Sequence, residues 1–425
     1  MNTKASLPVA IIGAGPVGLA AAAHLYSRHQ PFIILEAGDT VAANILSWKH
    51  IRVFSPWKYN VDTVARQLLE TIHWTMPEAD ALPTGAELYE HYLKPLADTP
   101  FIKPHLYLRT KVITVGRKGI DKTKTWAREE APYSIQAVRD GKVVQLEAKA
   151  MIDTSGTWAS PNPLGANGNY ASGETARREN IFYGIPDILH EQQDRYRSKS
   201  VLVVGSGHSA INVILELDKL KAIYPDTQIH WVLRKKSVHE VYGGQAKDAL
   251  AARGALGIRI EELVAEDRVN VYTPFYIQQV VREDDKLSVI GLQNDMQFKI
   301  PGIDEIICNT GSRPDFSFLR EVRLSVDPAL ESSAAIASLI DPNIHSCGTV
   351  RPHGEKELRH ADRDFYIAGS KSYGRAPTFL MATGYEQVRS IAAAIAGDYE
   401  AAQKVELNLP ETGVCKSDAV SSCCN

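Results

Sequence analysis

The chain has 425 residues, of which 44% are hydrophobic and 23% are charged, so it is long enough for two or three globular domains. Its formal net charge of −3 excludes the strongly basic surface of a typical nucleic-acid-binding protein and the polybasic patch of a protein that binds anionic lipid. Five cysteines are too few for a disulfide scaffold and favour the reducing environment of the cytoplasm.

The N-terminal stretch LPVAIIGAGPVGLAAAAHL is nearly free of charge and resembles a signal peptide or a membrane span. Its glycines at positions 13, 15 and 18 have the spacing of a nucleotide-binding turn instead. We therefore expect a cytoplasmic protein with no targeting segment and no membrane partner.

A strand, a glycine-rich turn, a helix and a second strand are predicted at residues 9–12, 13–18, 19–28 and 32–35. In this turn Gly13 permits the tight bend, Gly15 allows a pyrophosphate to approach, and Gly18 lets the helix pack on the strand. Pro16 and Val17 lie at the helix start, whose free N–H groups suit phosphates. Glu36 ends the second strand and can accept hydrogen bonds from ribose hydroxyls, so this unit is suited to FAD.

A second unit of the same kind begins with a strand at residues 201–204. Gly205 and Gly207 start its turn, His208 and Ser209 follow them, and Ala210 stands at the third glycine position. The next strand, residues 229–233, ends in a basic run rather than an acid, formed by Arg234, Lys235 and Lys236. Basic residues bind a 2′-phosphate, so the unit favours NADPH over NADH, unless the run is only a solvated strand end.

The two units together resemble class B flavoprotein monooxygenases and thioredoxin-reductase-like flavoproteins, from Pro8 to about Gly397. AMIDTSGTWASPNPLG and IICNTGSRPD resemble the segments at which such chains cross between their two domains. The resemblance implies an α/β fold with two Rossmann-like domains, in which an NADPH domain is inserted into a split FAD domain. The expected boundaries are a first FAD part at 1–160, a linker at 161–197, the NADPH domain at 198–304, a second FAD part at 305–400 and a tail at 401–425.

The same resemblance implies further contacts with FAD. Ser370 stands where many relatives have an aspartate that binds the ribityl chain. A helix expected from about Pro377 would direct its N-terminus at the flavin. The residues expected to contact FAD in this way are Trp48, Arg52, Val112 (through its backbone), Gly156, Gly369, Ser370, Thr378 and Phe379.

In such enzymes NADPH passes a hydride to flavin N5, and the reduced flavin then reacts with O2 or with an oxidised substrate. We therefore expect an oxidoreductase that acts on a small molecule, and we assign no catalytic side chain. Two departures leave the reaction open. Ile188 stands at the histidine position of the class B signature, with His190 two residues later, and the chain has no C-x-x-C motif. Oxygenase, reductase and low-turnover binding protein or sensor remain as alternatives.

Three further sets of residues carry polar or reactive side chains outside the two glycine-rich turns. The Gly/Ala-rich segment 242–257 is expected to be a loop that closes over NADPH, with Arg253 as a phosphate contact. His345, His353 and His360 match no metal-site spacing. Cys308 is expected to be buried and inert, and Cys347 to have a structural role in a loop.

The C-terminal stretch GVCKSDAVSSCCN holds three of the five cysteines, Cys415, Cys423 and Cys424. Three thiolates suit a soft, thiophilic ion, such as trivalent arsenic. Together with the stretches RVFSPWKYNVD, YGIPDIL and KSYGRAPTFLMATGYEQVR, this tail resembles that of the monooxygenase-like flavoproteins associated with bacterial arsenic resistance. The alternatives are a redox-active tail and thiols without a function.

Overall fold

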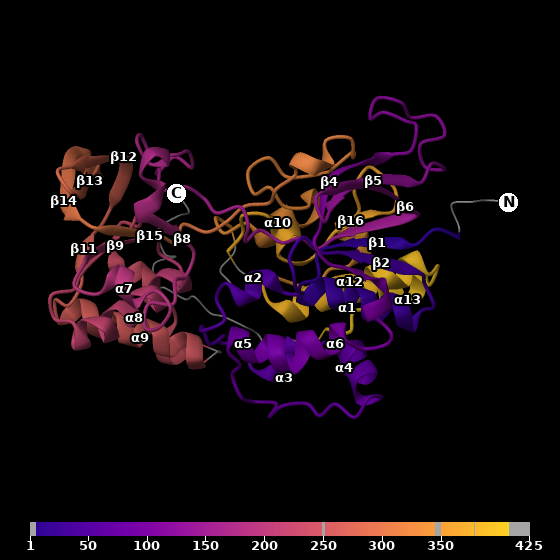
Figure 1. Cartoon of the computed structure of the whole chain (residues 1–425), viewed down its shortest axis with the longest axis horizontal. Helices are drawn as coiled ribbons and strands as arrows, with labels where there is room; N and C mark the ends of the chain where they lie inside the picture. Colours follow the sequence, from indigo (N-terminus) through magenta and orange to yellow (C-terminus); the bar gives the residue numbers. More distant parts are fainter. Residues whose placement is uncertain (1–5, 249–250, 345–349, 378, 408–425) are drawn as a thin grey trace, which may run out of the picture. The chain divides into compact units, whose positions relative to one another are not determined.

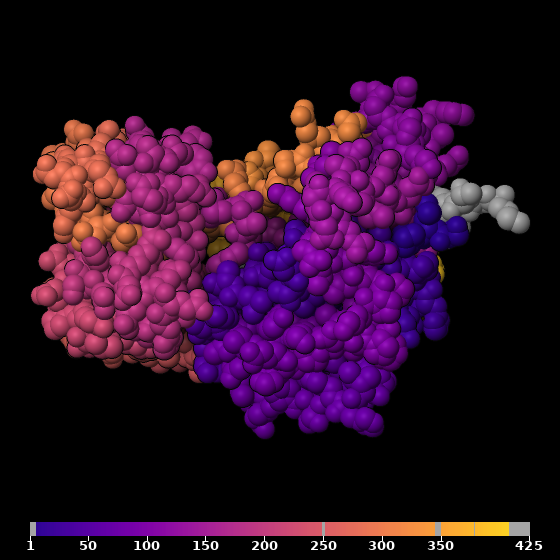
Figure 2. All heavy atoms as spheres, in the orientation of Figure 1, coloured from indigo at the N-terminus to yellow at the C-terminus, as the bar shows by residue number. Residues whose placement is uncertain are grey.

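The computed structural model describes residues 6–248, 251–344, 350–377 and 379–407 (Figure 1). Within them the chain forms two compact units, one of residues 6–160 and 313–407 and the other of residues 161–312. Figure 2 shows residues 161–312, in magenta to orange, gathered into one body. Within the described ranges, no helix has both the length and the apolar character that crossing a bilayer requires.

The first unit is built on a parallel sheet in the order β16-β7-β1-β2-β3. Successive residues of β1 enter different cores, because side chains alternate across a strand. Val9 and Ile11 pack with α1 and α12, whereas Ala10 and Ile12 pack with the antiparallel sheet β4-β5-β6. The elements are β1 (Val9–Ile12), α1 (Pro16–Ser27), β2 (Phe32–Leu35), β3 (Leu106–Tyr107), β4 (Thr110–Arg117), β5 (Tyr133–Arg139), β6 (Lys142–Ala148), β7 (Ala150–Asp153), β16 (Phe365–Ile367) and α12 (Met381–Ile395).

The second unit repeats this plan with a parallel sheet in the order β11-β10-β9-β15-β8. An antiparallel sheet, β12-β13-β14, shares an apolar core with it. The elements are β8 (Ile181–Tyr183), β9 (Ser200–Val204), α8 (His208–Ile223), β10 (Gln228–Val232), α9 (Ala251–Ala265), β11 (Asn270–Tyr272), β12 (Phe275–Glu283), β13 (Lys286–Gln293), β14 (Met296–Ile303) and β15 (Glu305–Cys308).

Shorter helices complete the two units. They are α2 (Ala43–Leu46), α3 (Trp57–Asn60), α4 (Thr63–Glu70), α5 (Gly85–Leu88), α6 (Lys94–Ala97), α7 (Gln193–Tyr196), α10 (Ala337–Ile340), α11 (Glu355–Leu358) and α13 (Tyr399–Gln403).

The boundaries of the units differ from those expected from the sequence. Residues 161–197, expected as a linker, belong to the second unit, as do residues 305–312, expected in the FAD domain. The physical reason is that β8 and β15 complete the second sheet beside β9. The buried carboxylate of Glu174 also accepts hydrogen bonds from Leu164 N, Ala171 N and the Tyr183 hydroxyl, at 2.6–2.9 Å, which ties the expected linker to β8.

Two helices begin elsewhere than expected. Helix α1 starts at Pro16, because proline is well suited to the first helical turn. Helix α12 starts at Met381 rather than at about Pro377, since Leu380 before it is extended.

The expectation of a loop over residues 242–257 is wrong, because α9 begins at Ala251. A Cβ atom at Gly254 would lie 2.1 Å from Gln245 O, and one at Gly257 would lie 1.9 Å from Tyr242 O. The two glycines therefore let this helix pack closely on the preceding turns. The guanidinium of Arg253 is mostly buried and forms two hydrogen bonds with Asp248, at 2.7 and 2.8 Å. This pairing does not favour Arg253 as a phosphate contact.

Candidate functional site

In the first unit, three neighbouring strands end in turns that only glycine adopts readily. Strands β16, β7 and β1 lie side by side, and the glycines that follow them are Gly369 (φ 74°), Gly156 (φ 70°) and Gly13 (φ 96°). The carboxyl ends of parallel strands are the usual ligand site of open α/β sheets. The sequence-predicted glycines therefore converge on one edge of the sheet.

The turn after β1 leaves room for a phosphate. Gly15 caps α1, and a Cβ atom at this position would meet nothing within 4 Å. A Cβ atom at Gly18 would lie 2.0 Å from Gly13 O, so the helix packs closely on the turn, as predicted. The Thr154 hydroxyl donates to Ile12 O (2.9 Å) and Gly13 O (3.1 Å) and fixes the turn from the side of β7. The free amides at the start of α1 suit a pyrophosphate, so this turn fits FAD.

The carboxylate of Glu36 is held in place at the end of β2. Its oxygens accept hydrogen bonds from Ala14 N and Gly38 N, both at 2.7 Å. Each carboxylate oxygen keeps a further lone pair, which can accept a ribose hydroxyl. Val112 lies on β4, two residues after Thr110, whose N–H donates to Glu36 O at 2.7 Å, and its side chain is buried in the core.

The turn after β16 packs against the start of α1. A Cβ atom at Gly369 would lie 3.4 Å from Val17, and one at Gly384 of α12 would lie 2.5 Å from Val17 and 2.9 Å from Phe379. Ser370 lies close to the turn after β7, since its Oγ is 3.5 Å from the Cβ position of Gly156. The structure thus brings together the predicted residues Gly13, Val17, Gly156, Gly369, Ser370 and Phe379. Thr378 lies outside the described residues.

Trp48 and Arg52 lie in the loops after α2. The Trp48 ring is 6.4 Å from the Trp158 ring, at 60°, and packs on Gly85. Arg52 is more than half exposed, and its guanidinium contacts Leu82 O and the Glu87 carboxylate. Trp158 is an aromatic neighbour that the sequence analysis missed, although it follows directly after the glycine turn of β7.

The second unit repeats the three glycine turns. Strands β9, β15 and β8 are neighbours and are followed by Gly205 (φ 140°), Gly311 (φ 87°) and Gly184 (φ 119°). A Cβ atom at Gly205 would lie 2.2 Å from Asn309 O, whereas one at Gly207, which caps α8, would meet nothing within 4 Å. His208 and Ser209 form the first turn of α8. The second unit therefore has open space at the N-terminus of α8, as the first has at the N-terminus of α1.

Positive charge takes the place of Glu36 in the second unit. Arg234 and Lys235 are exposed just beyond β10. Arg234 donates to Ala166 O at 3.0 Å, and Lys235 lies 3.7 Å from the Glu240 carboxylate. Both side chains can reorient toward a phosphate, because these contacts are at the surface.

The strand ends of β7 and β15 occupy equivalent places in the two sheets. Asp153 ends β7 between β1 and β16, and Cys308 ends β15 between β9 and β8. Each contacts a hydroxyl two residues later, Ser155 Oγ at 2.7 Å and Thr310 Oγ1 at 3.2 Å. The prediction that Cys308 is buried is confirmed, and burial raises the pKa of its thiol to about 12, which disfavours the reactive thiolate.

Two histidines that the sequence analysis considered, His353 and His360, are buried in the first unit. His353 is buried, which lowers its pKa, and its Nε2 accepts from Gln387 Nε2 at 2.9 Å. Gln387 Oε1 in turn accepts Gly369 N–H at 2.8 Å, so this network supports the turn after β16. Across the described ranges, no group of three His, Cys, Asp or Glu side chains could hold a metal ion. His345, Cys347, Cys415, Cys423 and Cys424 lie outside the described residues.

The family model described as pyridine nucleotide-disulphide oxidoreductase matches residues 10–334. Among curated proteins, the chain is 28% identical over 212 residues to probable indole-3-pyruvate monooxygenase YUCCA7 of Arabidopsis thaliana, a match that covers 49% of this chain and 43% of that protein. The match to YUCCA9 of the same organism is 26% identical over 220 residues and covers 50% and 45%. The matched region thus spans less than half the length of these relatives.

Solved structures share the fold over nearly the whole chain. The bacillithiol disulfide reductase of Bacillus cereus has a TM-score of 0.66 at 17% identity and covers 92% of this chain and 99% of its own. The FAD-bound cadaverine monooxygenase of Erwinia amylovora has a TM-score of 0.64 at 14% identity and covers 95% and 98%. The T. acidophilum thioredoxin reductase has a TM-score of 0.56 at 14% identity and covers 92% and 98%.

Proposed function

Because the chain belongs to the pyridine nucleotide-disulphide oxidoreductase family, we propose that it is an NADPH-dependent FAD enzyme of the monooxygenase-like kind. The coarser description, a flavin-dependent pyridine nucleotide oxidoreductase, follows from the family and the fold. One observation carries the finer proposal. The two units have matching glycine turns, but Glu36 follows the second strand of one, and Arg234 and Lys235 follow that of the other.

On the basis of that difference we assign one dinucleotide to each unit. In the first unit, the amides after Gly13 and Gly15 would bind the pyrophosphate of FAD, and Glu36 would bind its ribose. In the second unit, the amides after Gly205 and Gly207 would bind NADPH, with its 2′-phosphate at Arg234 and Lys235. FAD, when bound, supplies the chemistry of hydride acceptance and electron transfer to O2 or substrate.

The burial and the spacing of the cysteines favour oxygen over a dithiol as the electron acceptor. Cys308 is the one cysteine in the described part of the chain, and its raised pKa keeps it protonated at neutral pH. The sequence has no C-x-x-C pair that could serve as a redox dithiol. The curated relatives, named as probable monooxygenases, agree with this choice. We extend the proposal to an arsenic or thiol compound as the substrate, on the basis of the three tail cysteines.

Product labelling tests the oxygenase proposal. The FAD-loaded protein is mixed with NADPH and 18O2, and with arsenite or a low-molecular-mass thiol as the probe. We expect NADPH oxidation that the substrate stimulates, and one labelled oxygen in the product for each NADPH consumed. Oxidation of NADPH that yields only hydrogen peroxide with every probe contradicts this proposal.

A second candidate, a reductase, uses the tail thiols instead. Cys415, Cys423 and Cys424 are the cysteines that such a reaction needs, since the described thiol is buried. Deleting residues from Cys415 onward should then abolish NADPH-dependent reduction of a disulfide and the tight binding of arsenite, and leave FAD in place. If the truncated protein binds arsenite as well as the full chain does, the tail has no such role. Negligible NADPH oxidation with every acceptor would indicate a binding protein or sensor.

A further inference from the structure

A lysine ammonium is buried beside the proposed FAD turns. The side chain of Lys371 is completely shielded from solvent, and so is that of Asp153. Lys371 Nζ donates to Asp153 Oδ2 at 2.7 Å and to Ser155 Oγ at 3.1 Å. The rings of Phe318 and Phe316 lie 4.6 and 5.4 Å from the same nitrogen. Such burial is costly for a charged group, so it needs a specific reason.

This ion pair connects the turns that converge on the sheet edge. Asp153 pairs with Ile12 of β1 and Ile367 of β16, so it lies between the strands that lead to Gly13 and Gly369. Its backbone oxygen accepts Ala368 N–H at 2.9 Å, and its Oδ1 accepts Ser155 N–H at 3.0 Å. Lys371 lies two residues after Gly369, in the turn that also holds Ser370. The pair therefore ties the Ser155–Gly156 turn to the Gly369–Ser370 turn.

The fold itself does not require a charge at this position. In the second unit the equivalent strand end is Cys308, a neutral thiol that contacts Thr310 and the Asn162 carbonyl. A sheet of the same strand arrangement is thus completed there without a buried ion pair. The pair is specific to the unit in which we place FAD.

We propose that Asp153 and Lys371 are positioning residues that set the spacing of the Gly156 and Gly369–Ser370 turns and so control how tightly FAD is held. This inference rests on the proposed function, because it assumes FAD in the first unit. Neither side chain contacts the cofactor in this scheme, since both are fully buried. They act through the backbone of the two turns.

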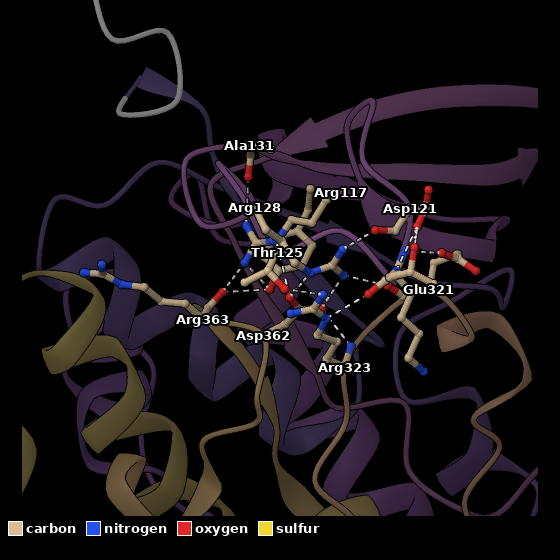
Figure 3. A network of polar contacts seen from close by, with 12 residues as sticks. Arg117, Asp121, Thr125, Arg128, Ala131, Glu321, Arg323, Asp362 and Arg363 are labelled. Atoms are coloured by element: carbon tan, nitrogen blue, oxygen red, sulfur yellow. Dashed lines mark hydrogen bonds and ion pairs between the residues drawn. The ribbon is translucent and has the colours of Figure 1, made fainter.

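The same chain offers a matched control at the opposite end of β16. Asp362 precedes that strand and is also buried, with Arg128 Nε and Nη2 donating to it at 2.6 and 2.8 Å (Figure 3). It also accepts Arg323 N–H at 2.7 Å. This pair joins the β4–β5 connection to the segment before β16 and lies away from the glycine turns. Asp362→Asn therefore makes the same chemical change in a pair that supports the fold alone.

The test measures FAD release, the flavin midpoint potential and Tm for the holoenzyme and its variants. We expect Asp153→Asn and Lys371→Met to release FAD about tenfold faster than wild type, because the two turns are no longer tied together; a tenfold change corresponds to about 1.4 kcal/mol of binding free energy. They should also shift the flavin potential. Asp362→Asn should lower Tm but leave the rate of FAD release and the flavin potential as in wild type. Ser155→Ala is a milder change that should accelerate FAD release with little loss of Tm. This variant keeps the test possible if Asp153→Asn and Lys371→Met do not fold.

The inference is overturned if Ser155→Ala, and whichever of Asp153→Asn and Lys371→Met folds, release FAD at the same rate as Asp362→Asn and have the same flavin potential. The proposed function still holds in that case if the wild-type protein binds FAD and is reduced by NADPH. Wild-type protein that retains no FAD overturns the proposed function and this inference with it.

Discussion

The indole N–H of Trp231 donates a hydrogen bond to Gly205 O at 2.7 Å and so holds the glycine turn of the second unit from within its core. Trp231 is fully buried on β10, the strand next to β9. In Trp231→Phe the carbonyl loses its donor, and an unsatisfied buried carbonyl costs about 1–3 kcal/mol. We expect a lower free energy of unfolding in urea, together with a higher KM for NADPH.

Tyr272→Phe is the control for that change. It removes a hydroxyl that lies 3.3 Å from His230 Nδ1 on β10 and leaves the glycine turn untouched. Its KM for NADPH should equal that of wild type. A Trp231→Phe protein with an unchanged KM would show that the indole supports the core and not the nucleotide turn.

Two glycines of the first turn separate cofactor binding from folding. Gly15 has φ −76°, which alanine adopts freely, and its Cβ would enter open space. Gly15→Ala should keep the unfolding free energy of the FAD-free protein within about 0.5 kcal/mol of wild type, but lose FAD, because the methyl group occupies the phosphate position. Gly18→Ala should lose FAD and also lower the free energy of unfolding, since its Cβ would lie 2.0 Å from Gly13 O. FAD content by absorbance and urea unfolding measure the two effects, and full FAD content in Gly15→Ala would contradict the assignment.

The glycine turns could be predicted because their signal is local. Strands β1 and β2 have the bounds expected from their apolar runs, and the spacing of the glycines marks the turn between β1 and α1. The segment around α9 could not be predicted, since its glycines have low helix propensity. Packing of Gly254 and Gly257 against carbonyl oxygens outweighs that propensity.

The buried pair of Asp153 and Lys371 also escaped the sequence analysis. A lysine between two serines in GSKSYG has the character of an exposed turn, and its partner is 218 residues away. One signal was available. The two similar segments IDTSG and ICNTG differ at the residue that ends an apolar strand, and an acid at such a position needs a partner.

Selectivity for NADPH depends on the basic residues after β10. A hydrogen bond to a charged group contributes about 1.5 kcal/mol or more, which corresponds to about tenfold in affinity. Arg234→Ala and Lys235→Ala should each raise the KM for NADPH about tenfold and leave that for NADH unchanged. Lys299→Ala, which removes an exposed lysine 2.9 Å from Glu283 on another sheet, is the control. Equal changes for the two nucleotides would mean that the basic run is only a solvated strand end.

Burial of His360 makes the stability of the first unit depend on pH. Its Nδ1 accepts Ser325 N–H at 3.0 Å, and burial lowers its pKa from the usual 6.5 to about 4. Between these values the unfolded chain takes up a proton that the folded protein does not, so the free energy of unfolding should fall as the pH decreases from 6.5 to 4, by about 3 kcal/mol in total. Asn at this position can accept the Ser325 N–H without titrating. Urea unfolding of His360→Asn should therefore show a shallower decline than wild type over this pH range and a parallel curve above pH 7. An equal decline in both proteins would show that other groups cause the acid sensitivity.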